Sequence, residues 1–493
     1  MASIGVWAFW RVSEGVESEA ASVIALSGSA GFGLALGAAL WVLARGVPLV
    51  VGRREALLLV AASWLLGALL SGLPYYIWPV WDIESGATHP FHSAVDCYFE
   101  AMSGLTTTGA TILSDVSALP KSLLLWRSLT QWLGGVGIVV LFVAVLPSLG
   151  VGGKNLYRVE APGPKSEGIH PQIRETARTL WLIYLGLTLL AAFLFRVFGM
   201  DWIDSVSHAL CALATGGFST KNSSIGGFNS ASIDMITILF MFLAGVNFSV
   251  YHQAVTGKVR SIFKDTELLC YITFLVVGSV IVSACLFNQP IITTSGEVLE
   301  PSAAQAVRHG VFATASQQTT TGFCTADFNG WPFVAKGVLI VLMFVGGCSG
   351  STAGGIKVMR VWIAIKVMAS ELEKIFRPHV VRPVKVSDAV VDEELKLGTL
   401  AYVLGILVIW AAGAGLIMLF EQASHECSLT TAGTASLATV CNIGPGLGKV
   451  GAVENYGWFT AQSKLVMCVL MVIGRLEVFA IAVLFLPRFW RGD

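Results

Sequence analysis

Charged side chains are scarce in this chain of 493 residues. Only 13% of its residues are Asp, Glu, Lys or Arg, whereas 55% are hydrophobic. Soluble domains carry roughly 25% charged residues, so a single water-soluble core is excluded. The formal net charge is zero, and the chain therefore lacks the basic surface that binding to nucleic acid requires.

Paired metal or redox ligands are also missing. The nine cysteines are scattered without a CxxC pair, and the eight histidines include no HExxH motif. Isolated cysteines in apolar sequence are typical of small buried hydrophobic residues. The sequence contains no Walker-type loop, no dinucleotide fingerprint and no nucleophile–base cluster. We therefore predict no enzyme activity, no cofactor and no transition-metal site.

Long apolar blocks are what the chain has instead. Blocks of about 20 apolar residues can cross a bilayer as helices. The candidate spans are Val23–Leu43, Ala56–Trp78, Leu123–Leu149, Leu180–Val197, Ile233–Val250, Leu268–Phe287, Val334–Gly347, Leu397–Phe420 and Lys464–Leu486. The sequence therefore predicts an all-α polytopic membrane protein.

Basic residues concentrate in five segments of the chain. Cytoplasmic loops are enriched in Lys and Arg, so these segments are expected on the cytoplasmic side. They are Arg45–Arg54, Lys154–Arg178, Lys258–Lys264, Lys357–Lys396 and Arg488–Arg491. This placement predicts that Met1 lies outside and that the C-terminal Asp493 lies in the cytoplasm.

The opposite connections share a short apolar segment followed by a Gly- and Thr-rich turn. Four such turns align on one glycine, at intervals of 108, 105 and 122 residues. They are Thr107-Thr108-Gly109, Thr215-Gly216-Gly217, Thr320-Thr321-Gly322 and Asn442-Ile443-Gly444. Internal repetition indicates one structural unit used several times. We predict an N-terminal helix and tail at 1–54 and repeats at 55–150, 151–257, 258–375 and 376–493.

Four re-entrant turns in one chain predict a pore. Irregular backbone at membrane depth is tolerated only where it is buried in protein or lines water. Carbonyl oxygens turned towards a common axis can replace the hydration shell of an alkali cation. Glycine suits such turns because successive inward carbonyls need positive φ. The C-terminal ends of the preceding half-helices add partial negative charge.

Several stretches of the sequence resemble one known family. They are GLTTTGAT (104–111), GGFST (216–220), TTTGF (319–323), GGCSGSTAGGIKVMR (346–360), NIGPGLG (442–448) and GRLEVF (474–479). This set is similar to the membrane subunit of the Trk/Ktr/HKT superfamily of potassium transporters, and to the TrkH branch most closely. The resemblance implies four M1–P–M2 repeats around one central pore, with the four aligned turns as a K⁺ selectivity filter.

The resemblance also implies the ion, the membrane and the partners. Relatives with serine at the first filter glycine tend to pass Na⁺, whereas all four glycines are intact here, so K⁺ and Rb⁺ are expected to pass better than Na⁺. The implied location is a bacterial inner membrane, and the implied partners are a second copy of the chain and a cytoplasmic nucleotide-binding ring of TrkA type. TrkH chains usually have two extra helices before the first repeat, whereas only Val23–Leu43 is long enough here, because Ile4–Arg11 is too short.

A gate is expected in the second helix of the third repeat. Small residues interrupt this apolar helix, where helix propensity is poor: Gly346, Gly347, Gly350, Ser351, Thr352, Gly354 and Gly355. The resemblance places this stretch below the filter. Arg475 is a charge within the last span, and intramembrane charges are functional by default. We predict that Arg475 faces the pore as a barrier to cations; a plain kink and a pairing of Arg475 with Glu477 are the alternatives.

The leading function is therefore gated K⁺ uptake driven by the membrane potential. The alternative is a symporter that couples K⁺ to H⁺ or Na⁺, which often needs an ionisable relay. We expect no carboxylate other than Glu477 to be buried in mid-span, and this disfavours symport. Arg127 and Gln131 precede a Gly-rich stretch at 134–137. This whole pattern has two interpretations, which are close helix packing through small residues and a role in gating.

Overall fold

The computed structural model describes most of the chain. The described residues are 1–14, 16–46, 53–82, 89–91, 93–140, 169–255, 262, 264–378, 383–386, 389–422, 427–478, 481, 483–485 and 487–491. Parts of several predicted features fall outside them. In the spans these parts are 141–149 of the third span and 479–480, 482 and 486 of the last one, which include Phe479 of the last motif. In the basic segments they are 47–52, 154–168, 258–261, 263, 379–382 and 387–388.

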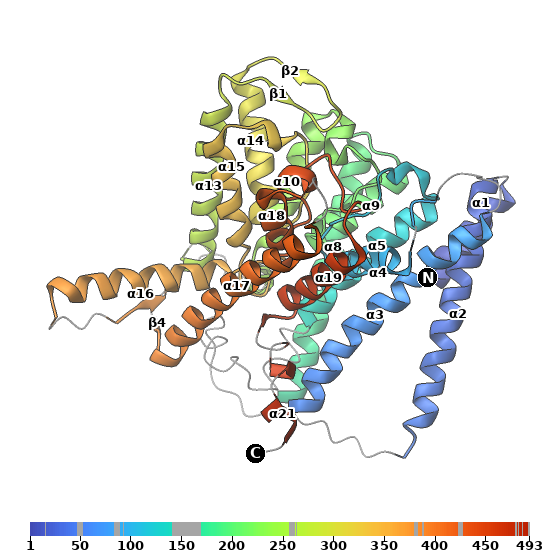
Figure 1. The fold of residues 1–493 in the computed structure, drawn as a ribbon, viewed down its shortest axis with the longest axis horizontal. Coiled ribbons are helices and arrows are strands. Elements are labelled where there is room, and N and C mark those ends of the chain that lie inside the picture. Colours follow the sequence, from blue (N-terminus) through green and yellow to red (C-terminus); the bar gives the residue numbers. More distant parts are fainter. Residues whose placement is uncertain are drawn as a thin grey trace.

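Two helices precede the repeating part of the chain. Helix α1 (Ala2–Ser13) has 12 residues and α2 (Ala20–Leu43) has 24. Figure 1 shows them side by side at one edge of the molecule. Helix α2 is long enough to cross a bilayer, whereas α1 falls short of the roughly 20 residues required. The predicted extra N-terminal span is therefore α2.

After α2 the described chain runs four times through a long helix, a half-length helix, a loop and a second helix. The long helices are α3 (Arg53–Trp81), α8 (Ile169–Val197), α13 (Thr266–Leu286) and α17 (Glu393–Phe420). The half-length helices are α4 (Ala94–Leu105), α9 (Trp202–Ala214), α14 (Ala303–Gln318) and α18 (Leu429–Val440). The second helices begin with α5 (Lys121–Val140), α10 (Ala231–Gly245), α15 (Phe333–Phe344) and α19 (Ala461–Arg475). This order confirms the predicted all-α polytopic fold.

The half-length helices occupy the centre of the molecule. All residues at 207–214 of α9 and at 434–440 of α18 are buried. By contrast, the apolar windows of α2, α3, α8, α13 and α17, which are long enough to span a membrane, are only 17% to 33% buried. Exposed apolar side chains are stable on these helices because they face lipid rather than water. The chain is thus a multi-pass membrane protein with its short helices inside.

Side chains fix where three of the half-length helices begin. Ser93, Asp201 and Ser428 stand at the N-caps of α4, α9 and α18, and each accepts a hydrogen bond from a backbone amide in the first turn. Ser and Asp are preferred at this position because they satisfy an otherwise unpaired amide. These N-cap bonds therefore define the first residue of three of the half-length helices.

Three of the second helices are interrupted. Helix α10 ends at Gly245 and α11 (Phe248–Val255) follows it; α15 is followed, after an irregular segment, by α16 (Val358–Phe376). Helix α19 ends at Arg475, and Glu477 has a φ of +61°. The predictions of continuous spans at Ile233–Val250 and Lys464–Leu486 are wrong in this respect. At α10 the reason is an inserted segment: the Cys348 amide donates to the Gly245 carbonyl at 2.9 Å, which helix continuation would have occupied.

Three smaller parts complete the described chain. Helix α16 extends away from the body of the molecule in Figure 1 and packs with Met359 and Ile363 on the hairpin of β3 (Lys385–Val386) and β4 (Ala389–Val390). A second hairpin, β1 (Ile291–Ile292) with β2 (Val298–Leu299), lies between α13 and α14. Helix α21 (Pro487–Arg491) lies near the C-terminus.

Candidate functional site

Each half-length helix ends in a loop with the same backbone shape. The first residue of each loop is left-handed, with φ between 53° and 55°. The third residue is a glycine with φ between 76° and 93°. The left-handed residues are Thr107, Thr215, Thr320 and Asn442, and the glycines are Gly109, Gly217, Gly322 and Gly444. Residues other than glycine rarely adopt positive φ, so four loops of unequal sequence share one unusual conformation.

These four loops meet in a closed ring. At each ring glycine, an added Cβ would come closer than 3.0 Å to the carbonyl oxygen of the middle residue in the next loop. The pairs are Gly109 with Gly216, Gly217 with Thr321, Gly322 with Ile443, and Gly444 with Thr108. Real Cβ atoms do not approach so closely, so only glycine fits between adjacent loops. The structure thus brings together the three predicted residues of every turn.

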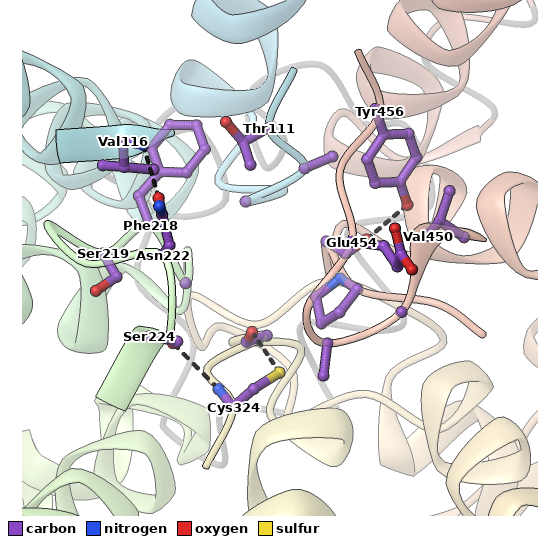
Figure 2. A pocket seen from close by; sticks show the side chains of 18 of the residues that line it. Thr111, Val116, Phe218, Ser219, Asn222, Ser224, Cys324, Val450, Glu454 and Tyr456 are labelled. Atoms are coloured by element: carbon purple, nitrogen blue, oxygen red, sulfur yellow. Dashed lines mark hydrogen bonds between the residues drawn. The ribbon is translucent and has the colours of Figure 1, made fainter. Parts of the chain in front are cut away.

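A cavity of about 80 Å³ lies on the glycine side of the ring (Figure 2). All four ring glycines line it, and charged side chains reach it from Arg127, Lys221 and Glu454. Figure 2 shows Glu454 and Tyr456 on the opposite side of the opening from Asn222. This volume is enough for a few waters or a small cation, so the ring opens into a small chamber with both charged and apolar side chains in its wall.

Hydroxyl pairs support the first and third loops. The Oγ1 atoms of Thr106 and Thr108 are 2.8 Å apart, and those of Thr319 and Thr321 are 2.7 Å apart. All four side chains are fully buried. Their β-branches restrict the side chains to few rotamers, and the hydrogen bond ties the middle residue of each loop to the end of its own half-length helix.

The fourth loop is supported by different groups. Asn442 Nδ2 donates to Thr108 Oγ1 and to the Met471 carbonyl, both at 3.0 Å. The Tyr456 hydroxyl donates to the Gly444 carbonyl at 2.6 Å, a bond visible in Figure 2. One carbonyl of a ring glycine therefore already has a donor from outside the loops.

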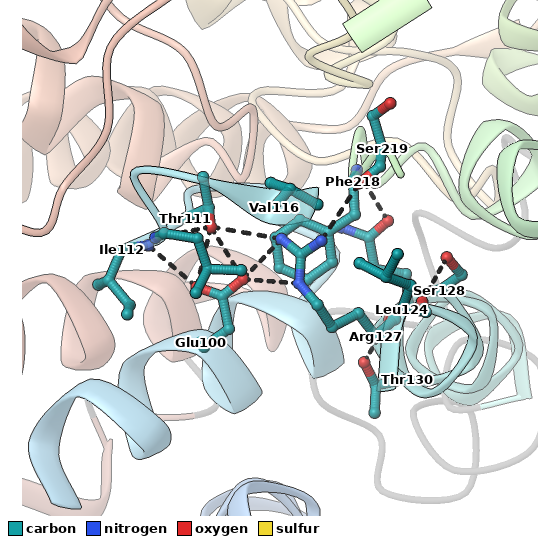
Figure 3. A network of polar contacts seen from close by, with 12 residues as sticks. Glu100, Thr111, Ile112, Val116, Leu124, Arg127, Ser128, Thr130, Phe218 and Ser219 are labelled. Atoms are coloured by element: carbon teal, nitrogen blue, oxygen red, sulfur yellow. Dashed lines mark hydrogen bonds and ion pairs between the residues drawn. The ribbon is translucent and has the colours of Figure 1, made fainter. Parts of the chain in front are cut away.

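An ion pair between Glu100 on α4 and Arg127 on α5 supports the first two loops (Figure 3). Arg127 Nη2 donates to Glu100 Oε1 at 2.6 Å, and the side chains are 2% and 0% exposed. The Thr111 hydroxyl and the Ile112 amide also donate to the Glu100 carboxylate, at 2.9 and 3.0 Å. Arg127 Nη1 donates to the Ser219 carbonyl at 3.2 Å. The pair thus holds the segments that follow the first two ring glycines.

The segment between α15 and α16 lies on the other side of the ring. Its Thr352 hydroxyl donates to the Leu213 carbonyl at 3.0 Å, and its Gly354 amide donates to the Thr320 hydroxyl at 2.6 Å. An added Cβ at Gly354 would collide with the Cys441 carbonyl. This segment therefore packs against the end of the second half-length helix, against the third loop and against the residue that follows the fourth half-length helix.

The other predicted gate residues lie within the same segment. Gly346 packs directly on Gly354 and Gly355, so that no side chain fits between these strands of backbone. Ser351 donates to the Cys348 carbonyl at 2.6 Å. An added Cβ at Gly347 would lie 2.8 Å from the Gly245 carbonyl and one at Gly350 would lie 3.2 Å from Asn247 Oδ1. Dense packing, rather than a simple kink, characterises the segment.

Arg475 joins this segment to the first repeat. Its Nη1 donates to the Thr352 carbonyl at 2.7 Å, and its Nη2 donates to the Gly134 carbonyl at 3.2 Å. The residue is only 3% exposed. The alternative in which Arg475 pairs with Glu477 is wrong, because Glu477 accepts from Arg360 Nη2 at 2.5 Å. Within the described part of the chain, Arg475 is a buried cation held by neutral carbonyls.

Comparison with known proteins identifies the family. The TrkH family profile, described as a cation transport protein, matches residues 33–491. The chain belongs to the TrkH family. It is 38% identical over 440 residues to the Trk system potassium uptake protein TrkH of Halomonas elongata, which is 89% of this chain and 86% of that protein. The protein of the same name from Escherichia coli K12 is 34% identical over 468 residues, with 93% and 90% covered.

A solved structure supports the same relationship. The crystal structure of the potassium transporter TrkH from Vibrio parahaemolyticus matches this TrkH-family chain with a TM-score of 0.79 at 32% identity, and the match covers 99% of each chain. Since the match includes almost the whole chain, the N-terminal helices belong to the shared architecture as well.

Buried charges in this TrkH-family chain were missed by the sequence analysis. Asp96 and Glu100 on the half-length helix α4 and Asp234 in the first turn of α10 are all buried. Each pairs with a cation: Asp96 with Lys464 at 2.6 Å and Asp234 with Arg308 at 2.7 Å, like Glu100 with Arg127. Acidic residues inside apolar half-length helices were the available signal. Among the described residues, no group of three or more His, Cys, Asp or Glu could hold a metal ion.

Close packing of α5 against two half-length helices explains the Gly-rich stretch after Gln131. An added Cβ at Gly134 would collide with the Leu105 carbonyl at the end of α4, and one at Gly135 would lie 3.1 Å from the Ala214 Cα. Small residues let α5 approach the half-length helices closely. Arg127 and Gln131, by contrast, reach the segments around the ring itself.

Proposed function

We propose that this chain takes up K⁺ across the membrane through a gated pore along the axis of the four-loop ring. The observation that supports this most directly is the closed ring of positive-φ glycines, each at the end of a buried half-length helix. Backbone carbonyls in such a ring can replace the hydration shell of an alkali cation. The C-terminal ends of the half-length helices add partial negative charge at the same place.

K⁺ is the proposed ion because the relatives are named potassium uptake proteins. Rb⁺, which is close to K⁺ in size, passes too, and Na⁺ passes less well. Because the four loops differ in sequence and in supporting groups, selectivity is weaker than in a filter of four identical loops. The membrane potential supplies about 2.3 kcal/mol per charge per 100 mV, so no second ion is required.

The gate in this proposal is the segment at 346–355 together with Arg475. The segment packs against the ends of the second, third and fourth half-length helices, and Arg475 connects it to the first repeat. A guanidinium without a carboxylate partner repels cations strongly at low dielectric. Opening therefore requires the segment and the Arg475 side chain to move away from the axis.

The proposed setting is a bacterial inner membrane with the C-terminus in the cytoplasm. This orientation puts the basic segments on the cytoplasmic side, as such loops usually are. The family resemblance supports a homodimer and a cytoplasmic nucleotide-binding ring of TrkA type as partners. In this arrangement the nucleotide-binding partner moves the gate, and the chain itself binds no nucleotide.

Cation flux into liposomes that contain the purified chain tests the function. K⁺, Rb⁺, Na⁺ or Li⁺ is supplied outside, and a potential is imposed with or without a pH gradient. The pore predicts K⁺ and Rb⁺ uptake that scales with potential and does not respond to the pH gradient. Uptake that requires an H⁺ or Na⁺ gradient would instead establish the symporter alternative.

A further inference from the structure

The second loop of the ring lacks a side chain that the other three loops have. Its middle residue is Gly216, where the other loops carry Thr108, Thr321 and Ile443. Gly216 does not have the positive φ of its neighbour Gly217, which is at +76°. Its backbone would therefore accept an ordinary L residue, and the absence of a side chain needs another explanation.

Gln131 of α5 fills the place of the missing side chain. An added Cβ at Gly216 would lie 2.8 Å from Gln131 Nε2 and even closer to the amide carbon and oxygen. The Gln131 side chain is fully buried. The amide group of Gln131 and a side chain at position 216 therefore exclude each other.

The Gln131 amide binds the backbone on both sides of the ring glycine. Nε2 donates to the Gly216 carbonyl at 2.6 Å, and Oε1 accepts from the Phe218 amide at 3.2 Å. These two bonds bracket Gly217. The Gly216 carbonyl is also the group that faces Gly109 of the first loop, so Gln131 holds an atom at the contact between two loops.

The second loop lacks a hydroxyl pair of the kind that supports the first and third loops. The first and third loops use hydroxyl pairs, whose first members are Thr106 and Thr319. The residue at that position in the second loop is Ala214. Two consecutive glycines without support have a wide choice of backbone conformations, so the loop needs a constraint from outside.

We propose that Gln131 is a positioning residue that sets ion specificity, by supplying from α5 the side chain that the second loop lacks. This inference rests on the proposed function, in which the ring is the K⁺ filter. Without Gln131 the Gly216 carbonyl rotates freely, and the second quarter of the ring no longer favours one cation radius. Gln131 therefore acts on selectivity through the loop and does not touch the ion.

Substitutions at positions 131 and 216, alone and together, test whether Gln131 sets ion specificity by taking the place of a side chain at Gly216. Gln131→Leu, which keeps the volume and removes both bonds, lowers the K⁺/Na⁺ uptake ratio in liposomes about 3- to 10-fold, as expected from one or two lost hydrogen bonds. Gly216→Ala alone lowers the ratio further, because the new methyl group collides with Gln131. The double variant Gly216→Ala with Gln131→Ala removes the collision, and its ratio exceeds that of Gly216→Ala alone. A merely structural role would lower the stability of Gln131→Leu but leave the K⁺/Na⁺ ratio of its folded fraction unchanged.

Gln318 provides the matched control. It is also buried and donates to a backbone carbonyl, that of Tyr271, at 3.0 Å. The residues at its position in the other loops are Leu105, Leu213 and Val440, so Gln318→Leu keeps the wild-type ratio. Folding of every variant is checked by size-exclusion chromatography and thermal unfolding.

The outcomes separate the inference from the proposed function. A wild-type chain that does not prefer K⁺ would overturn both. A K⁺-selective wild type whose folded Gln131→Leu variant keeps its ratio would overturn only the role of Gln131. The same conclusion would follow if the double variant were no more selective than Gly216→Ala.

Discussion

The four ring glycines should not be equally sensitive to substitution by alanine. At Gly109, Gly217 and Gly322 an added Cβ would collide with the carbonyl of the next loop, far inside the 3.0 Å that real Cβ atoms keep. At Gly444 the corresponding distance, to the Thr108 carbonyl, is 2.8 Å. Gly444→Ala should therefore be the mildest of the four changes.

The magnitude follows from two contributions. All four positions have positive φ, which costs an alanine about 1–2 kcal/mol wherever it stands. Relief of the contact at Gly444 requires a shift of roughly 0.6 Å to reach ordinary van der Waals distance, whereas the other three need more than about 1 Å. A shift of that size removes a carbonyl from the ion. A hydrogen bond to a charged group contributes about 1.5–3 kcal/mol, and by that analogy the K⁺/Na⁺ ratio falls about 10- to 100-fold.

The assay compares K⁺ and Na⁺ uptake by the four alanine variants in liposomes, with thermal unfolding to confirm that each is folded. Gly186→Ala on α8 is the matched control, because no atom lies within 4 Å of its added Cβ. The reasoning is refuted if folded Gly444→Ala loses as much selectivity as the other three, or if all four keep the wild-type ratio.

Three further predictions concern groups around the ring. Arg475→Ala raises K⁺ flux about 30-fold, because a unit charge at an assumed separation of about 8 Å contributes roughly 2 kcal/mol of barrier at an effective dielectric of 20. Arg475→Lys keeps the barrier, and unchanged or lower flux in the folded alanine variant would contradict the prediction. Tyr456→Phe frees the Gly444 carbonyl and changes the K⁺/Na⁺ ratio with a loss of only about 1 kcal/mol in unfolding free energy; an unchanged ratio speaks against this. Glu100→Gln leaves Arg127 uncompensated and costs about 3–5 kcal/mol of stability; its thermal unfolding temperature should fall and should recover partly with Arg127→Met added.

The sequence was sufficient to predict what depends on local pattern. Apolar blocks gave the spans, and four Gly turns at regular spacing indicated the loops, because span length and positive φ are properties of short segments. Asn442 illustrates the strength of the alignment: it differs from threonine in chemistry but has a φ of 55°, the same as Thr320.

Features that depend on distant segments could not be predicted. The break after Gly245 is occupied by Cys348, about 100 residues later in the chain, so no local signal in α10 announced it. Lys464 and Asp96 are separated by 368 residues. Hydropathy averaged along the chain places a span boundary at such a charge, whereas in the structure Lys464 and Asp96 are buried as a pair.

The unequal loops explain how a single chain differs from a ring of identical subunits. In a symmetric ring one sequence must support all four quarters in the same way. Here the first and third loops use hydroxyl pairs, the second uses the amide of Gln131, and the fourth uses Asn442 and Tyr456. The glycine positions and φ values nevertheless agree closely. The four quarters therefore share one backbone conformation, and each reaches it with different supporting residues. It follows that the loop sequence alone is a poor guide to selectivity, and that residues on the surrounding helices must be read with it.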